Sequence, residues 1–180
     1  MVFHKHQRVS VLVDVQNMYY SAKFAYNAKV NFKELLNVAV RGRKLIRALA
    51  YVIKADAKDE STFFEALYNI GYEVRAKDLQ IFYGGAKKGD WDVGIAMDAL
   101  RLAQKSDTIV LVSGDGDFRD LVLYLKSMGC RVEIIAFGKS TNAKLIEEAD
   151  NFVDMDKHLD KFLIRDRKKI VRRPVHSEKA

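Results

Sequence analysis

Apolar and polar positions follow two rhythms along this chain, and each rhythm predicts a kind of element. Short β-branched runs or strict alternation predict five strands, at 8–14, 44–54, 72–74, 108–112 and 131–137. Apolar residues at helical spacing predict helices over 17–28, 32–41, 58–70, 91–104, 118–128, a stretch ending at 149, and 157–169. Further extended pieces are expected at 79–83 and 152–153, and a flexible basic loop at 84–89.

The alternation of strands and helices is typical of an α/β fold, in which helices cover both faces of a mostly parallel sheet. We expect a doubly wound sheet whose five strands, numbered along the chain, lie in the order 3-2-1-4-5. The first and fourth strands are then neighbours where the chain direction reverses. Ligands bind beyond the carboxyl ends of the strands at such a point, so candidate chemistry is expected there.

Acidic residues gather at this edge of the predicted sheet. The segment IVLVSGDGDF at 109–118 is an apolar strand that stops at Ser113 and Gly114 and is followed by Asp115 and Asp117. Asp14 ends the first strand, and Asp92 follows the loop after the third strand. Because the carboxyl ends of parallel strands share one rim, we expect these four carboxylates to surround one pocket.

Four carboxylates in one pocket stay ionised together only beside a compensating cation. Oxygen ligands suit Mg²⁺ or Mn²⁺, and a cation held in this way activates water and neutralises charge on a phosphodiester. Zinc is not indicated, because all four histidines lie near the chain ends. The residues predicted to bind the substrate are Lys87, Lys88, Ser113 and Arg119.

Each acid also has an ordinary structural explanation. Asp14 and Asp92 are placed to cap helices, and Asp115 and Asp117 are placed to form Asx turns or a cap. Ser113 precedes a glycine, as the nucleophile of some hydrolases does, but no histidine lies near it in the sequence. A serine–histidine mechanism is therefore not favoured, and the convergence of four acids favours a functional site.

The net charge of +7 is concentrated at the C-terminal end. Residues 161–180 hold eight Lys or Arg and two acids, whereas residues 1–160 are nearly neutral. We therefore expect one domain over 1–160 and a basic tail over 161–180, which either contacts a phosphate backbone or is a solvated terminus. No apolar run is long enough for a membrane span, no signal peptide is recognisable, and Cys130 is the single cysteine, so a cytoplasmic location is expected.

Three blocks of the sequence resemble NYN domains of the LabA-like group, which belong to the PIN-like nucleases. VLVDVQNMYY at 11–20 is similar to the opening strand and helix of these domains, with Asn17 three residues after Asp14. KGDWDVGIAMDAL at 88–100 is similar to the K-G-x-D-V segment, with one extra residue before Asp92. LVSGDGDFRDL at 111–121 is similar to the S-G-D-x-D-F motif, and the resemblance extends over about 8–155, including EADNFVD at 148–154.

The resemblance implies a PIN-like, Rossmannoid three-layer sandwich and a metal-dependent ribonuclease that acts on RNA. Carried over by position, Asp14, Asp92, Asp115 and Asp117 would bind the metal or activate the attacking water, and Asn17 would orient the site. Asp98 is a secondary candidate, although it lies about 9 Å beyond Asp92 along its helix and on another face.

Two other functions remain open from the sequence. One is a non-catalytic RNA-binding or regulatory module that keeps the acidic pocket and uses its basic tail for affinity. The other is a haloacid-dehalogenase-like phosphatase, because GDGD after a late strand is similar to an element of that family. The first strand here ends D-V-Q rather than D-x-D, so the partner acid of an aspartyl nucleophile is missing.

Overall fold

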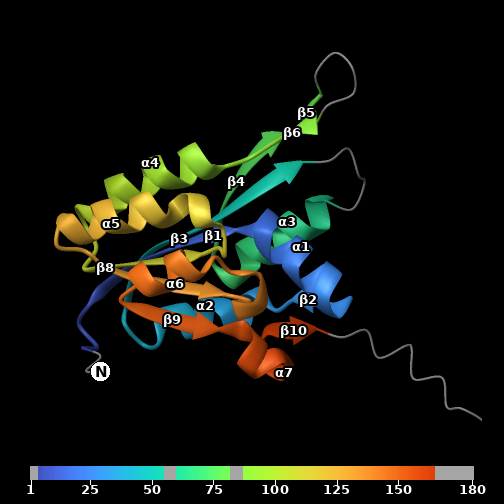
Figure 1. The fold of residues 1–180 in the computed structure, drawn as a ribbon. Coiled ribbons are helices and arrows are strands. Elements are labelled where there is room, and N and C mark those ends of the chain that lie inside the picture. The colour runs from blue at the N-terminus through green and yellow to red at the C-terminus, as the bar shows by residue number, and fades with distance from the viewer. Residues whose placement is uncertain (1–3, 55–59, 82–86, 165–180) are drawn as a thin grey trace, which may run out of the picture.

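A six-stranded sheet forms the centre of the computed structural model, which describes residues 4–54, 60–81 and 87–164. Its order is β4-β3-β1-β7-β8-β9, and all neighbouring strands are parallel (Figure 1). The strands are β1 (Arg8–Asp14), β3 (Lys44–Lys54), β4 (Glu73–Asp78), β7 (Thr108–Val112), β8 (Arg131–Ala136) and β9 (Asn151–Asp154). The five predicted strands have the predicted order, and the extended piece expected at 152–153 forms β9, a sixth strand beside β8 that the predicted order did not include.

Helices cover both faces of the sheet, so the domain has the three layers expected of an α/β fold. Helices α4 and α5 pack together on one face, with α6 beside α5, and α1, α2 and α3 lie on the other (Figure 1). The helices are α1 (Val15–Tyr26), α2 (Phe32–Val40), α3 (Glu60–Ile70), α4 (Asp92–Ala103), α5 (Arg119–Ser127), α6 (Ala143–Glu148) and α7 (Leu159–Phe162). Among the described residues, none of the helices combines the length and apolar character needed to cross a membrane.

Short elements complete the fold around these layers. Two antiparallel pairs join β2 (Lys29–Val30) to β10 (Leu163–Ile164) and β5 (Gln80–Ile81) to β6 (Lys87–Lys88). Single 3₁₀ turns, η1 (Gly116–Phe118), η2 (Gly138–Ser140) and η3 (Met155–His158), follow β7, β8 and β9. Each of these turns therefore lies at the carboxyl end of a strand, where the candidate chemistry was expected.

The two central strands supply the most deeply buried part of the core. All five residues of β7 are buried, as are residues 9–13 of β1. Complete burial of one aliphatic side chain contributes about 1.5–3 kcal/mol, so this pair of strands forms a rigid base. Asp14 and the segment after Val112 leave that base at the same edge of the sheet, because Val13 pairs with Val112.

The end of the described chain differs from the prediction. A helix was expected over 157–169, but the helix α7 ends at Phe162, and Leu163 and Ile164 pair with β2. Phe162 and Leu163 are buried, and the Asn31 amide donates to the Phe162 carbonyl at 2.8 Å. Long-range pairing with β2 thus outweighs local helical preference, and residues 165–169 lie outside the described residues. The packed chain continues to Ile164, and the domain boundary at 160 stays a prediction.

The basic loop expected at 84–89 also differs in part. Lys87 and Lys88 form β6 and pair with Ile81 and Gln80, so this part of the segment is extended backbone. Residues 82–86, including Tyr83, lie outside the described residues. Gly71 and Gly129 follow the ends of α3 and α5, and both adopt a positive φ, +113° and +83°, that other residues rarely adopt.

Candidate active site

Three aspartates meet beyond the carboxyl end of the central strand β7. Asp92 is the first residue of α4, and Asp115 and Asp117 belong to the turn between β7 and α5. One carboxylate oxygen from each of the three lies within 4.8 Å of the others. Asp92 and Asp115 are partly buried and Asp117 is exposed, so the group opens to solvent on one side. This arrangement can surround one cation while leaving room for a substrate.

Asp14 lies beside these three aspartates but outside the group whose oxygens meet. It ends β1, and one carboxylate oxygen accepts the Asn17 amide at 3.0 Å while the other accepts the Ser113 hydroxyl at 3.5 Å. Burial, and then the negative charges of Asp92 and Asp115, raise the pKa of Asp14 to about 6. Asp14 is therefore close enough to the acidic group to be influenced by its charge.

The turn after β7 is held by side chains predicted to belong to the site. The Asn17 side-chain oxygen accepts the Gly114 amide at 3.1 Å, the Ser113 hydroxyl accepts the Asp115 amide at 3.3 Å, and Asp115 accepts the Asp117 amide at 3.0 Å. Asn17 thus holds the turn through the Gly114 amide, and the role in the site that the resemblance implied stays a prediction. The Ser113 hydroxyl also donates to Asp14, so Ser113 positions both Asp14 and Asp115. Its side chain is completely buried, and this burial does not fit the predicted role in substrate binding.

The turn also depends on a loop that sequence reasoning did not assign to the site. A Cβ on Gly114 would lie 2.8 Å from the Thr141 hydroxyl oxygen and 3.2 Å from its Cα, and a Cβ on Gly116 would lie 2.5 Å from the Asn142 side-chain nitrogen. The loop after β8 therefore packs directly against the turn that carries Asp115. This loop follows β8, the strand next to β7. Because neighbouring parallel strands end at the same edge of a sheet, the sequence could have indicated that the loop lies near the acids.

The structural explanation of the acids is correct for two of them. Asp14 caps α1, and Asp115 caps the turn η1. Asp92 does not cap α4: Trp91 occupies that position without a side-chain hydrogen bond, so the capping prediction for Asp92 is wrong. Burial, together with the charges of Asp90, Asp115 and Asp117, raises the pKa of Asp92. Its carboxylate is consequently available for a ligand.

One cation near the acids was missed by sequence reasoning. Lys77, in the edge strand β4, has its Nζ 4.0 Å from the centre of the Trp91 ring and 3.4 Å from the Asp90 carbonyl oxygen. Its charge lowers the pKa of Asp92. A lysine on an edge strand gives no special sequence signal, because edge strands commonly carry lysine. Its position makes Lys77 a candidate for contact with a phosphate.

The other predicted cations are placed less clearly. Lys87 and Lys88 form β6, and their side chains are outside what the structure describes. Arg119 pairs with Glu148 at 2.8 Å and with Asp120 at 3.6 Å. These ion pairs give Arg119 a structural role between α5 and α6, and its predicted contact with substrate stays a prediction.

Asp98 is not brought to the acidic group. One of its oxygens accepts the Tyr51 hydroxyl at 3.0 Å, and the other pairs with Arg101 at 3.2 Å. Tyr51 belongs to β3 and Arg101 to α4 itself, so both hydrogen bonds join Asp98 to neighbouring parts of the fold. Asp98 lies six residues after Asp92 and therefore on a different face of α4, which explains why its side chain is separated from the acidic group.

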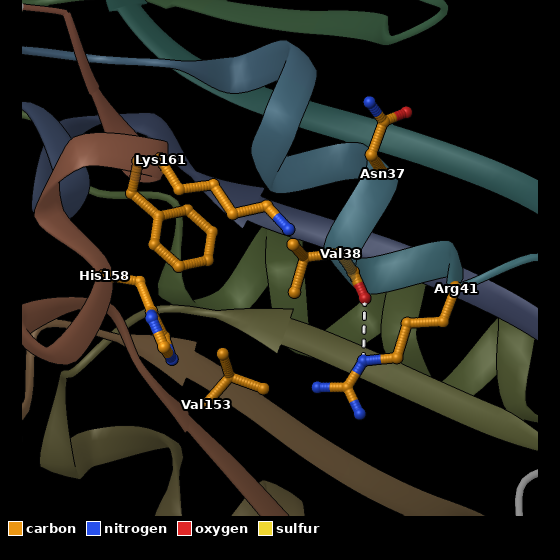
Figure 2. Close-up of a pocket in the computed structure, with 7 residues that line it drawn as sticks. Asn37, Val38, Arg41, Val153, His158 and Lys161 are labelled. Atoms are coloured by element: carbon orange, nitrogen blue, oxygen red, sulfur yellow. Dashed lines mark hydrogen bonds between the residues drawn. The ribbon is translucent and has the colours of Figure 1, made fainter.

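A separate pocket of about 380 Å³ lies between α2 and the segment from β9 to α7 (Figure 2). Its lining includes Arg41, His158 and Lys161, and the Arg41 Nε donates to the Val38 carbonyl at 3.0 Å. None of the site aspartates lines it. The acids thus form an open group at the sheet edge rather than the wall of this pocket.

The raised pKa of Asp14 predicts an effect on stability. In metal-free protein, Asp14→Asn should raise the free energy of unfolding at pH 7.5 by about 1–3 kcal/mol, because asparagine caps equally well without a buried charge. The folded-state pKa, about 6, exceeds the unfolded value, so wild-type stability falls as pH rises from about 4 to 6. The gain should disappear near pH 4.

Thermal unfolding of both proteins in EDTA between pH 4 and 8 measures this difference. The control is Asp78→Asn, which removes an exposed carboxylate on β4 and should show no such trend. A constant difference between wild type and Asp14→Asn at all pH values would contradict the prediction.

A parallel α/β sheet with acids gathered beyond its central strands defines a protein class whose ligands bind at the switch point of the sheet. The NYN domain family matches residues 8–156. The chain belongs to this family, which is associated with nuclease activity. The resemblance stated from the sequence motifs is therefore confirmed.

Two relatives support the same assignment. The Low amplitude and bright protein LabA of Synechococcus elongatus is 26% identical over 157 residues, which cover 83% of this chain and 84% of LabA. The crystal structure of a protein of unknown function from Vibrio parahaemolyticus is 36% identical, with a TM-score of 0.82, and the match covers 91% of this chain and all of that one. The chain is thus a LabA-like NYN domain protein, and the α/β fold is shared with a solved structure.

The residues present fit a divalent metal ion. The group offers only carboxylate oxygens, the donors that Mg²⁺ and Mn²⁺ prefer. Among the residues that the structure describes, no Lys or Arg forms an ion pair with Asp92, Asp115 or Asp117. Three neighbouring carboxylates without such a partner repel one another, so a cation would stabilise them.

Proposed function

We propose that the chain is a metal-dependent endoribonuclease that hydrolyses phosphodiester bonds of RNA at Asp92, Asp115 and Asp117. The observation that carries the proposal is the meeting of three carboxylate oxygens within 4.8 Å at the switch point of the sheet. Membership of a family associated with nuclease activity supports the same reaction class. Mg²⁺ or Mn²⁺ is the proposed cofactor.

Each acidic residue has a proposed role. Asp92, Asp115 and Asp117 would hold the metal, which would lower the pKa of a nearby water and neutralise charge on the phosphate. Asp14 is assigned to accept a proton from the attacking water at a carboxylate oxygen, because it ends the strand beside β7 and lies close enough to Asp92 and Asp115 for their charges to act on it. Asn17 and Ser113 keep the turn and Asp14 in place through their hydrogen bonds.

Positive side chains near the acids are assigned to the RNA backbone. Lys77 lies close enough to Asp92 to lower the pKa of that carboxyl, so its ammonium can meet a phosphate held there. Lys87 and Lys88 remain proposed contacts from the sequence. The basic segment after Ile164 is proposed to bind RNA outside the site.

The proposal is tested by incubating a labelled, unstructured RNA with the full chain in Mn²⁺, in Mg²⁺ and in EDTA. Cleavage with either metal, and none in EDTA, is expected. Mn²⁺ should also raise the melting temperature, because a ligand that binds the folded state stabilises it. Binding of RNA without cleavage in either metal would overturn the nuclease and favour a non-catalytic RNA-binding module.

Removal of residues 165–180 should weaken RNA binding. The cut follows Ile164, because Phe162 and Leu163 are buried and their loss would disturb the fold. The removed segment holds seven Lys or Arg and two acids. Each phosphate contact with a single strand contributes about 0.7 to the slope of log affinity against log salt, so the slope should fall by up to about 5.

Fluorescence anisotropy of a labelled RNA across about 50–200 mM salt measures that slope. The melting temperature of the shortened chain should match that of the full chain. An unchanged salt slope would show that the tail makes no contact with RNA.

A further inference from the structure

One face of α1 exposes three aromatic side chains to solvent. Tyr19 and Tyr20 are 47% and 44% exposed, and Phe24 is 79% exposed. We call Tyr19, Tyr20, Lys23 and Phe24 the aromatic face. Such a group of large apolar rings on a surface is unusual and marks a binding surface more often than an isolated exposed side chain does.

The rings are already ordered relative to one another. Tyr20 and Phe24 are stacked, with centroids 5.7 Å apart and planes 12° apart, and Tyr19 meets Tyr20 edge-on at 5.4 Å. The helix beneath them is fixed, because Met18 and Ala22 are completely buried on its other side. A flat ligand would therefore stack on these rings with little further loss of side-chain freedom.

The aromatic face begins at the candidate active site. Asn17, Tyr20 and Phe24 have the spacing i, i+3 and i+7, which places them on one stripe of the helix. Asn17 is hydrogen-bonded to Gly114 in the acidic turn, so the stripe starts at that turn. Phe24 lies about 10 Å from Asn17 along the axis, a distance that about three stacked nucleotides span.

The charge around these rings suits nucleic acid. Helix α1 contains no acidic residue, and its Lys23 Nζ lies 5.2 Å from the centre of the Tyr19 ring. Outside the aromatic face, Lys139 of η2 has its Nζ 5.7 Å from the centre of the Tyr26 ring, whose hydroxyl donates to Asp156. Aromatic rings for bases, next to ammonium groups for phosphates, are the usual composition of surfaces that bind single strands.

We propose that the aromatic face is a stacking platform for unpaired bases of single-stranded RNA, next to the bond that is cleaved. This inference rests on the proposed function and adds a preference for single strands. Bases within an A-form duplex already stack on each other, so their faces cannot reach Tyr20 or Phe24. The same surface would bind a duplex only through phosphate contacts.

Binding of RNA without cleavage tests the platform. The full chain carries Asp115→Asn, the buffer contains EDTA, and the probe is a labelled oligouridylate of about 10 nucleotides. Tyr20→Ala and Phe24→Ala should each weaken its binding about 5- to 150-fold, and affinity for an RNA duplex should stay unchanged. Tyr20→Phe and Phe24→Tyr keep a ring and should restore binding.

Tyr68→Ala is the matched control. Tyr68 is 74% exposed on α3, outside the aromatic face, and its loss should not change affinity. Alanine favours helix at these exposed positions, so circular dichroism should be the same for all variants. The salt dependence of binding should also be unchanged by loss of a ring and should fall by about 0.7 in slope for Lys23→Gln.

The outcomes separate this inference from the proposed function. Ring-dependent binding by a chain that never cleaves RNA would keep the platform and remove the nuclease. The opposite result would overturn the platform. In that case the wild-type chain cleaves RNA with metal, while Tyr20→Ala and Phe24→Ala in the binding assay bind the oligouridylate as tightly as their parent. Light scattering gives a further outcome that would overturn the platform. If Tyr20→Ala and Phe24→Ala bound RNA as tightly as the parent but had a smaller particle mass than the parent, the face would join two copies of the chain.

Discussion

Asp115→Asn is expected to lower the rate of RNA cleavage in Mn²⁺ by at least about 100-fold. Loss of residues that only support metal ligands costs about 10- to 100-fold, and loss of a ligand itself should cost more. The change is nearly isosteric, and the asparagine oxygen can still accept the Asp117 amide as Asp115 does. The turn should therefore keep its shape while the group loses one negative charge.

The measurement is single-turnover cleavage of the labelled RNA by wild type and variant at matched concentrations. Asp120→Asn is the charge-matched control, because Asp120 is exposed on α5 and pairs only loosely with Arg119 at 3.6 Å. It should cleave at the wild-type rate. The metal-induced rise in melting temperature should be lost with Asp115→Asn and kept with Asp120→Asn.

Equal cleavage by wild type and Asp115→Asn would exclude the acidic group as the site of chemistry. A variant whose rise in melting temperature is normal but whose cleavage is lost would indicate that Asp115 acts on substrate rather than on metal. In metal-free buffer, Asp115→Asn should be at least as stable as wild type, because it relieves repulsion between neighbouring carboxylates.

Local pattern was sufficient to predict the central strands and the edge at which the acids lie. Apart from Ser10 and Thr108, residues 9–13 of β1 and all of β7 are apolar, which is the pattern of strands buried on both faces. Asp14 ends β1 and Asp115 lies three residues after β7, so the parallel topology alone brings both to one edge. The pattern could not show that Asp92, Asp115 and Asp117 would meet while Asp14 stayed outside their group.

What the sequence could not supply were contacts between distant segments. The end of the last helix depends on β10 pairing with β2, and no local pattern carries that information. Lys77 reaches Asp92 because β4 ends beside the start of α4, and Thr141 supports Gly114 across two neighbouring strands. Each of these contacts joins residues that are more than ten positions apart, and the periodicity of apolar residues gives no information about such contacts.

Glu133 is the clearest case of a residue whose role depends on such a partner. It lies within the apolar strand β8, and its carboxylate is buried against the Arg43 guanidinium, with contacts of 3.1 and 3.0 Å. Arg131 donates a further hydrogen bond at 2.9 Å. Although burial alone would raise it, the hydrogen bonds from the two arginines lower the pKa of Glu133 below its usual value.

Glu133→Gln should lower the free energy of unfolding by about 3–5 kcal/mol at pH 7, because it removes the buried negative charge that Glu133 places against the Arg43 guanidinium. The lowered folded-state pKa means that the ion pair stabilises above the unfolded pKa, about 4.3, and that this contribution is lost as pH falls through the folded value. The difference between wild type and variant should therefore narrow below about pH 4.

Glu73→Gln is the matched control for this prediction. Glu73 also pairs with an arginine, Arg47, through two hydrogen bonds, but both side chains are more than a third exposed. An exposed pair contributes about 0–1 kcal/mol, so the control should unfold at nearly the wild-type urea concentration. Urea midpoints with an unchanged m-value measure both effects. Equal losses for the two variants would show that burial does not set the strength of the Arg43–Glu133 pair, since burial is the main difference between them.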